Sequence, residues 1–270
     1  MTIPRSFSLR AILSAIALAP LTASSDPLED GAQVIGTSLT VVLEGRHRTG
    51  PDLIGFTLTV ADDKGIAVDI RIDGAVKGNS GSGIDWLYDL RTQDGAGTWV
   101  TYCDAAVGGD RLGFPVAGWT DPSGAFHPSD RAMTFSCIGG AIAKCIRMGY
   151  SPWRDDVEDT SRLGQFRACT RMIRADYCGT GESHTKDGTP VNVYDRHSLP
   201  KDGSAPGMSF EAAWGPDGAV CVAKTRWPDL VTLDRLRDAC GEKLASRIGP
   251  RCTPSIAQEL PGALIFNESP

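Results

Sequence analysis

The sequence lacks long hydrophobic runs, blocks of like charge and low-complexity tracts. Its longest uncharged apolar stretch, Ala11 to Leu21, covers about eleven residues, whereas a membrane-spanning helix needs about 20. We therefore expect no membrane-spanning segment. Several motifs of known chemistry are also missing: the nucleophile elbow Gly-x-Ser-x-Gly, the Walker phosphate loop, the dinucleotide-binding glycine pattern and the zinc motif His-Glu-x-x-His. The sequence indicates no cofactor.

The N-terminal residues have the layout of a secretory signal peptide. Arg5 and Arg10 precede the apolar stretch, and the small residues Thr22-Ala23-Ser24-Ser25 follow it. We expect cleavage after Ser24, with Ala23 and Ser25 as alternatives. Residues 1–24 are then a signal peptide, and the mature protein is secreted or periplasmic.

The charge balance argues against polyanionic partners. Removal of residues 1–24 takes away two arginines and no acidic residue, so the formal charge changes from −6 to −8. A protein this acidic is not suited to general binding of nucleic acids or anionic membranes. An envelope or extracellular protein, or a small-molecule ligand, fits this charge better.

Eight cysteines lie downstream of the expected signal peptide, and an even number in an exported protein predicts disulfides. The closest two, Cys137 and Cys145, are eight residues apart, too far for a typical structural zinc site, so we expect no metal. Eight cysteines allow 105 pairings, and the sequence does not choose among them. Joining neighbouring elements gives the pairs Cys103–Cys137, Cys145–Cys169, Cys178–Cys221 and Cys240–Cys252.

The hydrophobic period changes near residue 138. Before it, apolar residues alternate with polar ones, as in Leu39, Val41 and Leu43, and again in Ile66, Val68, Ile70 and Ile72. A period of two predicts strands with one buried face. Turn sequences at residues 62–65 and 121–124 suit hairpin connections. We expect an antiparallel β sandwich or barrel in a β-rich N-terminal region, residues 25–136.

The second half, residues 137–270, has a mixed pattern. A helical period predicts helices over Gly139–Met148 and Arg162–Tyr177, and a third over Asp229–Cys240. Two strands, Ser209–Trp214 and Ala219–Trp227, flank the turn sequence Gly215-Pro216-Asp217-Gly218, and Ala263–Phe266 is a last strand. The fold class is thus α+β, with the sandwich or barrel followed by a disulfide-stapled helix-helix-β-hairpin-helix region.

Several separated motifs in this half resemble one family. Arg174-Ala175-Asp176-Tyr177-Cys178-Gly179 is followed by His184-Thr185 and Asp187-Gly188-Thr189, and Phe210-Glu211-Ala212-Ala213-Trp214 and Ala219-Val220-Cys221 come later. In this order the motifs resemble the ADYC domain of bacterial exported proteins, over roughly Cys137 to Cys252. The resemblance implies export and a cysteine framework. It implies no catalytic residue, because the function of the family is unknown.

Three arginines, Arg167, Arg171 and Arg174, share one face of the second predicted helix, opposite the apolar face. We expect this face to be exposed, and it is a candidate site for an anionic ligand. The favoured alternative is pairing with nearby acidic residues, such as Asp155 and Asp156. Tyr177 ends the apolar face and should lie in the core, while Asp176 should cap the chain or pair with an arginine.

The segment after the tetrapeptide holds the weak catalytic candidates, His184 and Asp187. With Asp195 and His197, it contains two imidazoles and two carboxylates that a folded-back loop would gather. Solvated residues of an Asp-Gly turn are the favoured alternative. Ser183 and Lys186 have the Ser-x-x-Lys spacing of penicillin-binding enzymes, but the surrounding glycines favour a loop over the required helix.

Two functions from different classes follow from these patterns. The first is a binding or structural module without catalytic activity. The alternative is an extracytoplasmic hydrolase that uses His184 and nearby polar residues. A complete catalytic constellation is missing from the sequence, so we favour the first, and whether the protein is an enzyme stays open.

Overall fold

The computed structural model describes residues 31–61, 67–79, 83–153, 162–195 and 206–270. The expected signal peptide, residues 1–24, lies outside the described residues, as does His197. The chain divides into two compact units. The first extends to Trp119 and includes Ser129–Gly139, and the second consists of Thr120–Pro128 and Gly140–Pro270. Within the described residues, no helix is long and apolar enough to cross a membrane.

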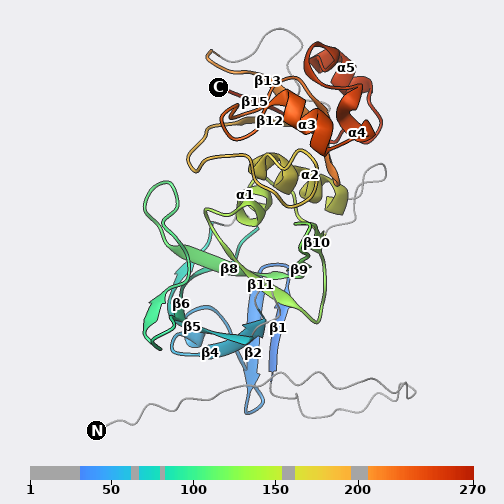
Figure 1. Cartoon of the computed structure of the whole chain (residues 1–270). Helices are drawn as coiled ribbons and strands as arrows, with labels where there is room; N and C mark the ends of the chain where they lie inside the picture. Colours follow the sequence, from blue (N-terminus) through green and yellow to red (C-terminus); the bar gives the residue numbers. More distant parts are fainter. Residues whose placement is uncertain (1–30, 62–66, 80–82, 154–161, 196–205) are drawn as a thin grey trace, which may run out of the picture. The chain divides into compact units, whose positions relative to one another are not determined.

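The first unit consists of antiparallel strands. A three-stranded sheet has the order β1-β2-β3, formed by Gly31–Ile35, Ser38–Leu43 and Arg46–Arg48. The larger sheet has the order β11-β8-β6-β5-β4, with β7 paired to β6 (Figure 1). These strands are β4 (Thr57–Ala61), β5 (Ala67–Lys77), β6 (Trp86–Gln93), β7 (Trp99–Thr101), β8 (Leu112–Ala117) and β11 (Met133–Cys137), and a 3-10 turn (Gly50–Leu53) precedes β4.

The two sheets of this unit share one core. Val34, Leu39 and Val41 from the small sheet pack in one cluster with the inward residues of the larger sheet, among them Ile70 and Leu90. Each of these residues is at most 7% exposed. The predicted alternation therefore places one side of the main strands in the core, in the manner of a sandwich.

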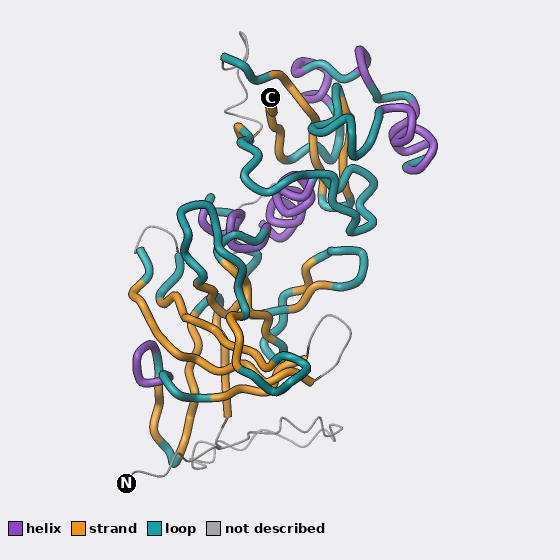
Figure 2. Tube along the Cα trace, turned by 60° about the vertical axis from the view of Figure 1, so that its left-hand side comes forward, coloured by secondary structure: helices purple, strands orange, loops and turns teal. Residues whose placement is uncertain are grey.

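The second unit combines helices with a four-stranded sheet of order β12-β15-β13-β14. Its strands are β12 (Asn192–Asp195), β13 (Ser209–Gly215), β14 (Gly218–Val222) and β15 (Ile265–Ser269). Its helices are α1 (Ala141–Arg147), α2 (Arg162–Arg174), α3 (Leu233–Ala239), α4 (Glu242–Ala245) and α5 (Pro254–Glu259), with a 3-10 turn at Gly249–Arg251. Figure 2 shows the contrast between the strand-rich first unit and this mixed unit. The α+β class is confirmed.

The short hairpin β9 (Trp119–Thr120) and β10 (Phe126–His127) carries residues 120–128, which belong to the second unit. Phe126 is buried and meets Phe166 of α2 edge to face, with ring centroids 5.2 Å apart. The hairpin turn is fixed by Asp121, whose carboxylate accepts bonds from the Ala125 amide and the Ser123 hydroxyl. Helix α2 is therefore covered by a segment that precedes it by about forty residues in the sequence.

Eight cysteines form four disulfides, and two of the four predicted pairs are wrong. Cys103–Cys137 and Cys145–Cys169 are as expected, but Cys178 joins Cys240, and Cys221 joins Cys252. Cys221 points into a cluster with Cys252, Ala257 and Phe266 that contains no residue of α2. Cys221 therefore packs away from the end of α2, near which Cys178 lies, although the two cysteines are consecutive in the sequence.

Some element limits also differ from the sequence prediction. The third helix begins at Leu233, because the Thr232 side chain caps it by accepting a bond from the Arg235 amide. Strand β14 ends at Val222, so Trp227 lies beyond it.

Candidate functional site

The most buried polar cluster of the second unit is centred on an ion pair between Glu211 and Arg226. Glu211 lies on β13 at a β-bulge: Phe210 pairs with Glu268 of β15, and Ala212 already pairs with Asn267. The extra residue lets the strand turn the Glu211 side chain toward the C-terminal end of α2. The side chains of Arg226 and Glu211 are 1% and 0% exposed.

The Glu211 carboxylate accepts four hydrogen bonds. Arg226 binds both of its oxygens, with Nε at 2.9 Å from Oε2 and Nη2 at 3.1 Å from Oε1. The Asn267 amide donates to Oε2 at 2.7 Å, and the Tyr177 hydroxyl donates to Oε1 at 3.0 Å. With two donors at each oxygen, this buried carboxylate has the hydrogen-bond partners that the burial of a polar group requires.

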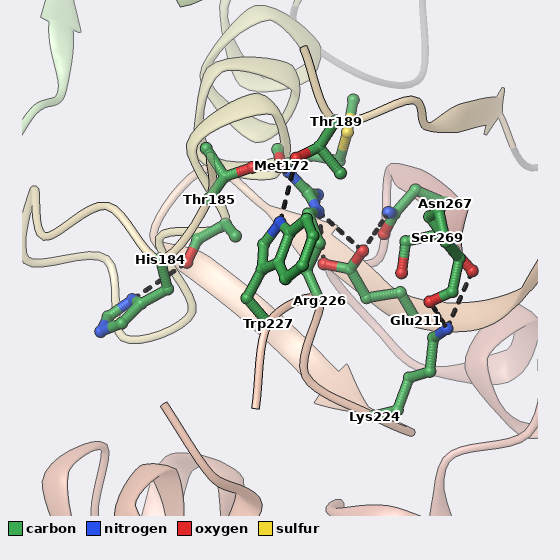
Figure 3. A network of polar contacts seen from close by, with 12 residues as sticks. Met172, His184, Thr185, Thr189, Glu211, Lys224, Arg226, Trp227, Asn267 and Ser269 are labelled. Atoms are coloured by element: carbon green, nitrogen blue, oxygen red, sulfur yellow. Dashed lines mark hydrogen bonds and ion pairs between the residues drawn. The ribbon is translucent and has the colours of Figure 1, made fainter. Parts of the chain in front are cut away.

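The guanidinium of Arg226 uses all five of its N–H groups. Besides the bonds to Glu211, Nη2 donates to the Met172 carbonyl at 2.8 Å, and Nη1 donates to the Ile173 carbonyl and the Thr185 hydroxyl at 3.1 and 3.2 Å. Figure 3 shows Arg226 between Glu211 on one side and Met172 and Thr185 on the other. The cation thus satisfies the last carbonyls of the helix and opposes the negative end of its dipole.

Tyr177 and Asn267 extend the cluster to the aromatic core. The Tyr177 hydroxyl accepts a bond from the Arg226 backbone amide at 2.8 Å, and its ring stacks on Trp214 at 5.2 Å between centroids. The Trp214 indole N–H donates to Asn267 Oδ1 at 2.8 Å. Burial, with the nearby Glu211 charge, raises the pKa of Tyr177 well above 10.0. We name Tyr177, Glu211, Arg226 and Asn267 the central network.

The family model of the ADYC domain matches residues 50–228 of this chain. The chain belongs to the ADYC domain family. The match begins earlier than the motifs found by sequence analysis, inside the first unit, and ends before Cys252. No curated protein and no solved structure matches the chain.

The ADYC tetrapeptide, Ala175–Cys178, has a separate structural role at each position. Ala175 follows α2 with a positive φ of 50°, which ends the helix, and the Asp176 amide then donates to the Arg171 carbonyl at 2.9 Å. Asp176 accepts bonds from the Thr180 and Gly181 amides and pairs with Arg171 at 2.5 Å. Tyr177 joins the central network, and Cys178 forms a disulfide. The predicted roles of Asp176 and Tyr177 are confirmed.

Gly179 continues this turn at a position where only glycine fits. Its φ is +70°, and an added Cβ would lie 2.0 Å from the Asp217 carbonyl oxygen. The neighbouring Ala219 amide donates to the Tyr177 carbonyl at 2.8 Å. The tetrapeptide is therefore packed directly on the turn between β13 and β14.

We expected the arginine face of α2 to be exposed, but its side chains are buried or half-buried. Arg171 is 3% exposed; it pairs with Asp176 and donates to the Ser123 and Pro216 carbonyls. Arg167 donates to the Phe126 carbonyl at 2.8 Å, and Arg174 donates to the Gly181 carbonyl. The acidic partners favoured at residues 155–156 lie outside the described residues. These arginines hold loops of the second unit onto α2.

His184 is also buried, at 9% exposed, and not a solvated loop residue. Its Nδ1 lies 3.2 Å from the Ala175 carbonyl oxygen, its Nε2 lies 3.6 Å from the exposed Glu182 carboxylate, and its ring is 5.9 Å from that of Tyr177. No hydrogen bond or ion pair between described atoms joins His184 to Asp187, which is exposed. The structure does not bring the two weak catalytic candidates together.

The residues on either side of His184 also contact other segments of the second unit. Ser183 donates to the Arg174 carbonyl, while Lys186 pairs with Asp229 at 2.6 Å and lies 4.0 Å from the Trp227 ring centre. The Trp227 indole donates to Thr189 at 3.0 Å. Ser183 and Lys186 thus have different partners, and the Ser-x-x-Lys spacing forms no helical pair.

Glu211, Arg226 and Asn267 were not identified as site residues by sequence analysis. One signal was present: Glu211 is a charged residue inside the apolar strand Phe210-Glu211-Ala212-Ala213-Trp214. A buried strand position seldom carries a charge unless a partner lies opposite. The identity of that partner depends on contacts between residues 15 and 56 positions apart.

Proposed function

We propose that this ADYC-domain protein is an exported, disulfide-stabilised binding module and not an enzyme. The observation that carries the proposal is the saturation of the central network. The side chains of Glu211 and Arg226 are almost fully buried, and each carboxylate oxygen and each guanidinium N–H already has an intramolecular partner. A catalytic acid or base needs contact with a substrate, so this network supports structure.

The hydrolase alternative has less support from the geometry. The described contacts of His184 are a backbone carbonyl, an exposed carboxylate and an aromatic ring. None of these is a hydroxyl or thiol that the imidazole would activate as a nucleophile. The Ser183 hydroxyl donates to a backbone carbonyl instead.

The binding surface that we propose is the loop of residues 180–189, which Asp176, Arg226 and Trp227 hold in place. Asp176 binds its first amides, Arg226 binds Thr185, and Trp227 binds Thr189. Glu182, Lys186 and Asp187 are exposed on it. A loop attached at several points loses little conformational entropy when it binds a partner, which favours affinity.

Export is tested by producing the full chain in a bacterium and sequencing the N-terminus of the soluble envelope fraction. We expect a mature protein that begins at Ser25 and has no alkylatable thiol. A cytoplasmic protein with residues 1–24 intact would contradict the export part of the proposal.

Binding is tested by site-specific photo-crosslinking in the cell envelope of the producing organism. A photoreactive amino acid replaces Asp187, and the matched control replaces Asp130, an exposed aspartate of the first unit. We expect a discrete crosslinked product at position 187 and none at position 130. Equal labelling at both positions would show that this loop is not the binding surface.

A further inference from the structure

The four disulfides differ in their access to solvent. Cys145, Cys169 and Cys221 are 0% exposed, Cys252 is 2% exposed, and Cys103 is 1% exposed beside a half-buried Cys137. In Cys178–Cys240 both residues are half-buried. Cys178–Cys240 is thus the disulfide in which neither residue is buried, so a thiolate in solution can approach it from either residue, and the approach of the attacking sulfur limits exchange.

The two ends of this disulfide are held very differently. Cys178 is fixed on the central network, because Tyr177 precedes it and Gly179, which follows it, is packed against Asp217. The Tyr177 carbonyl is also bound by the Ala219 amide at 2.8 Å. This end of the disulfide cannot move unless the network opens.

Cys240 ends a weakly held helix. Helix α3 has seven residues, of which only Leu236 is buried. Its ion pair between Arg237 and Asp234 lies on the surface and contributes little. A helix this short is only marginally stable by itself, so its position depends on its contacts with the rest of the unit. The Cys178–Cys240 disulfide links the end of α3 covalently to the segment that follows α2.

We propose that Cys178–Cys240 is a thiol–disulfide exchange site, whose natural reactant is a dithiol reductant. One thiolate of the reductant attacks a sulfur of the pair, forms a mixed disulfide and displaces the other cysteine as a thiolate. The second thiol of the reductant then displaces the remaining cysteine. Two electrons and two protons pass to the protein, which gains two thiols, and the reductant becomes a disulfide.

Reduction at this site frees the end of α3 and leaves the central network closed. None of the hydrogen bonds to Glu211 or to the Arg226 side chain comes from α3. The chain segment that changes is therefore residues 233–240, and β13 keeps its partners. This inference goes beyond the proposed binding function and does not depend on it.

The test is timed reduction of the native, fully oxidised protein with dithiothreitol under non-denaturing conditions. Aliquots are alkylated and the modified cysteines are identified by peptide mass spectrometry. We expect Cys178 and Cys240 to be modified together, at least about tenfold faster than any other pair, since buried disulfides react only after the structure opens. Faster modification of another pair, or simultaneous modification of all eight, would overturn the proposal.

Hydrogen exchange of the reduced protein, with Cys178 and Cys240 as thiols, distinguishes local release of α3 from unfolding of the second unit. We expect faster exchange in residues 233–240 and unchanged exchange in residues 209–215. An equal increase in both segments would mean that reduction unfolds the unit, and the proposal would be wrong.

Matched double variants provide a control. Cys178→Ser with Cys240→Ser should remove the fast phase, while Cys145→Ser with Cys169→Ser, which removes a buried pair, should leave it. A fast phase that persists in the first variant would contradict the assignment. If the first variant does not fold, the time course of the unmodified protein still decides the question.

Discussion

Tyr177 provides a sharp test of the central network, because one oxygen atom serves two buried partners. In the variant Tyr177→Phe the ring remains, so its stacking on Trp214 is preserved. The hydroxyl is lost, and with it the bond to the Glu211 carboxylate at 3.0 Å and the bond from the Arg226 amide at 2.8 Å. The change therefore isolates the hydrogen bonds from the packing.

The expected cost follows from these two bonds. A hydrogen bond to a charged group contributes about 1.5–3 kcal/mol, and a buried amide left without an acceptor costs about 1–3 kcal/mol. Because the two effects share one oxygen and partly overlap, we expect a loss of about 3 kcal/mol in the free energy of unfolding. The control is Tyr194→Phe on the half-buried strand β12, whose hydroxyl donates to Glu268 Oε2 at 3.0 Å. There we expect a loss of about 1 kcal/mol.

Urea unfolding followed by fluorescence measures the difference between the variants, and hydrogen exchange of the Arg226 amide identifies its source. This amide should exchange much faster in Tyr177→Phe and normally in Tyr194→Phe. A loss of less than about 0.5 kcal/mol in Tyr177→Phe, the range of ordinary surface changes, would refute the view that the network holds the unit together.

The same tyrosine predicts a pH effect. Its pKa is raised in the folded protein, so its contribution to stability is complete below about pH 10 and is lost as the pH rises further. Burial also raises the pKa of Tyr88 to about 12, so the variant should keep part of this alkaline loss. Unfolding curves between pH 8 and pH 11 should therefore fall less steeply for Tyr177→Phe than for the unchanged protein. Parallel curves would exclude Tyr177 as a source of the slope.

Three further predictions concern other parts of the second unit. Arg226→Lys keeps the charge but replaces five planar donors by three, so we expect a loss of about 3 kcal/mol in urea unfolding, and full stability would contradict the role of the planar group. His184→Ala removes a buried ring with a carbonyl contact, so we expect a loss of about 1 kcal/mol, whereas a surface loop residue would show almost none. The Ser123 hydroxyl and His127 hold the pKa of Asp121 well below its usual 3.8. The stability that this carboxylate contributes above pH 4 should therefore be lost as the pH falls toward the folded pKa. Asp121→Asn should remove this dependence from unfolding curves measured between pH 2 and pH 5.

The fold class could be predicted from the sequence because the hydrophobic period reports directly on burial. The residues Val68, Ile70 and Ile72 alternate, and Ile70 and Ile72 lie in the core of the first unit. The helical period likewise located α2, and the turn Gly215-Pro216-Asp217-Gly218 located the hairpin of β13 and β14. These patterns involve residues that are close in the sequence, so they do not depend on how the elements pack together.

The arginine face of α2 shows where the period is insufficient. The pattern separated Arg167, Arg171 and Arg174 from the apolar face correctly, but it suggested that they meet solvent. Apart from the Asp176 carboxylate, which pairs with Arg171, their partners are main-chain carbonyls of residues 123, 126, 181 and 216. A carbonyl group is present in every residue and leaves no mark on the sequence. The turn at residues 121–124 could therefore be predicted, but the packing of its hairpin on α2 could not.

The disulfides show the same limit. Cys103–Cys137 and Cys145–Cys169 each join two cysteines that are consecutive along the chain, so the order of the cysteines was a sufficient guide. Each of the other two pairs skips the next cysteine along the chain. Cys221 faces the cluster with Cys252, while Cys178 lies at the end of α2, and this difference arises only when α2 packs on the sheet.

Apart from the exchange that we propose at Cys178, the tetrapeptide of the family is explained by folding and not by chemistry. Ala175 ends α2, Asp176 receives the amides of the following loop, Tyr177 supplies the central network, and Cys178 holds α3. Each of these atoms already has its partner inside the chain, so the motif has little left with which to bind a substrate. What the motif does provide is a fixed start for residues 180–189, whose exposed side chains belong to the loop and not to the tetrapeptide. If family members differ in what they bind, the difference should therefore lie in this loop, while the residues that support it stay the same.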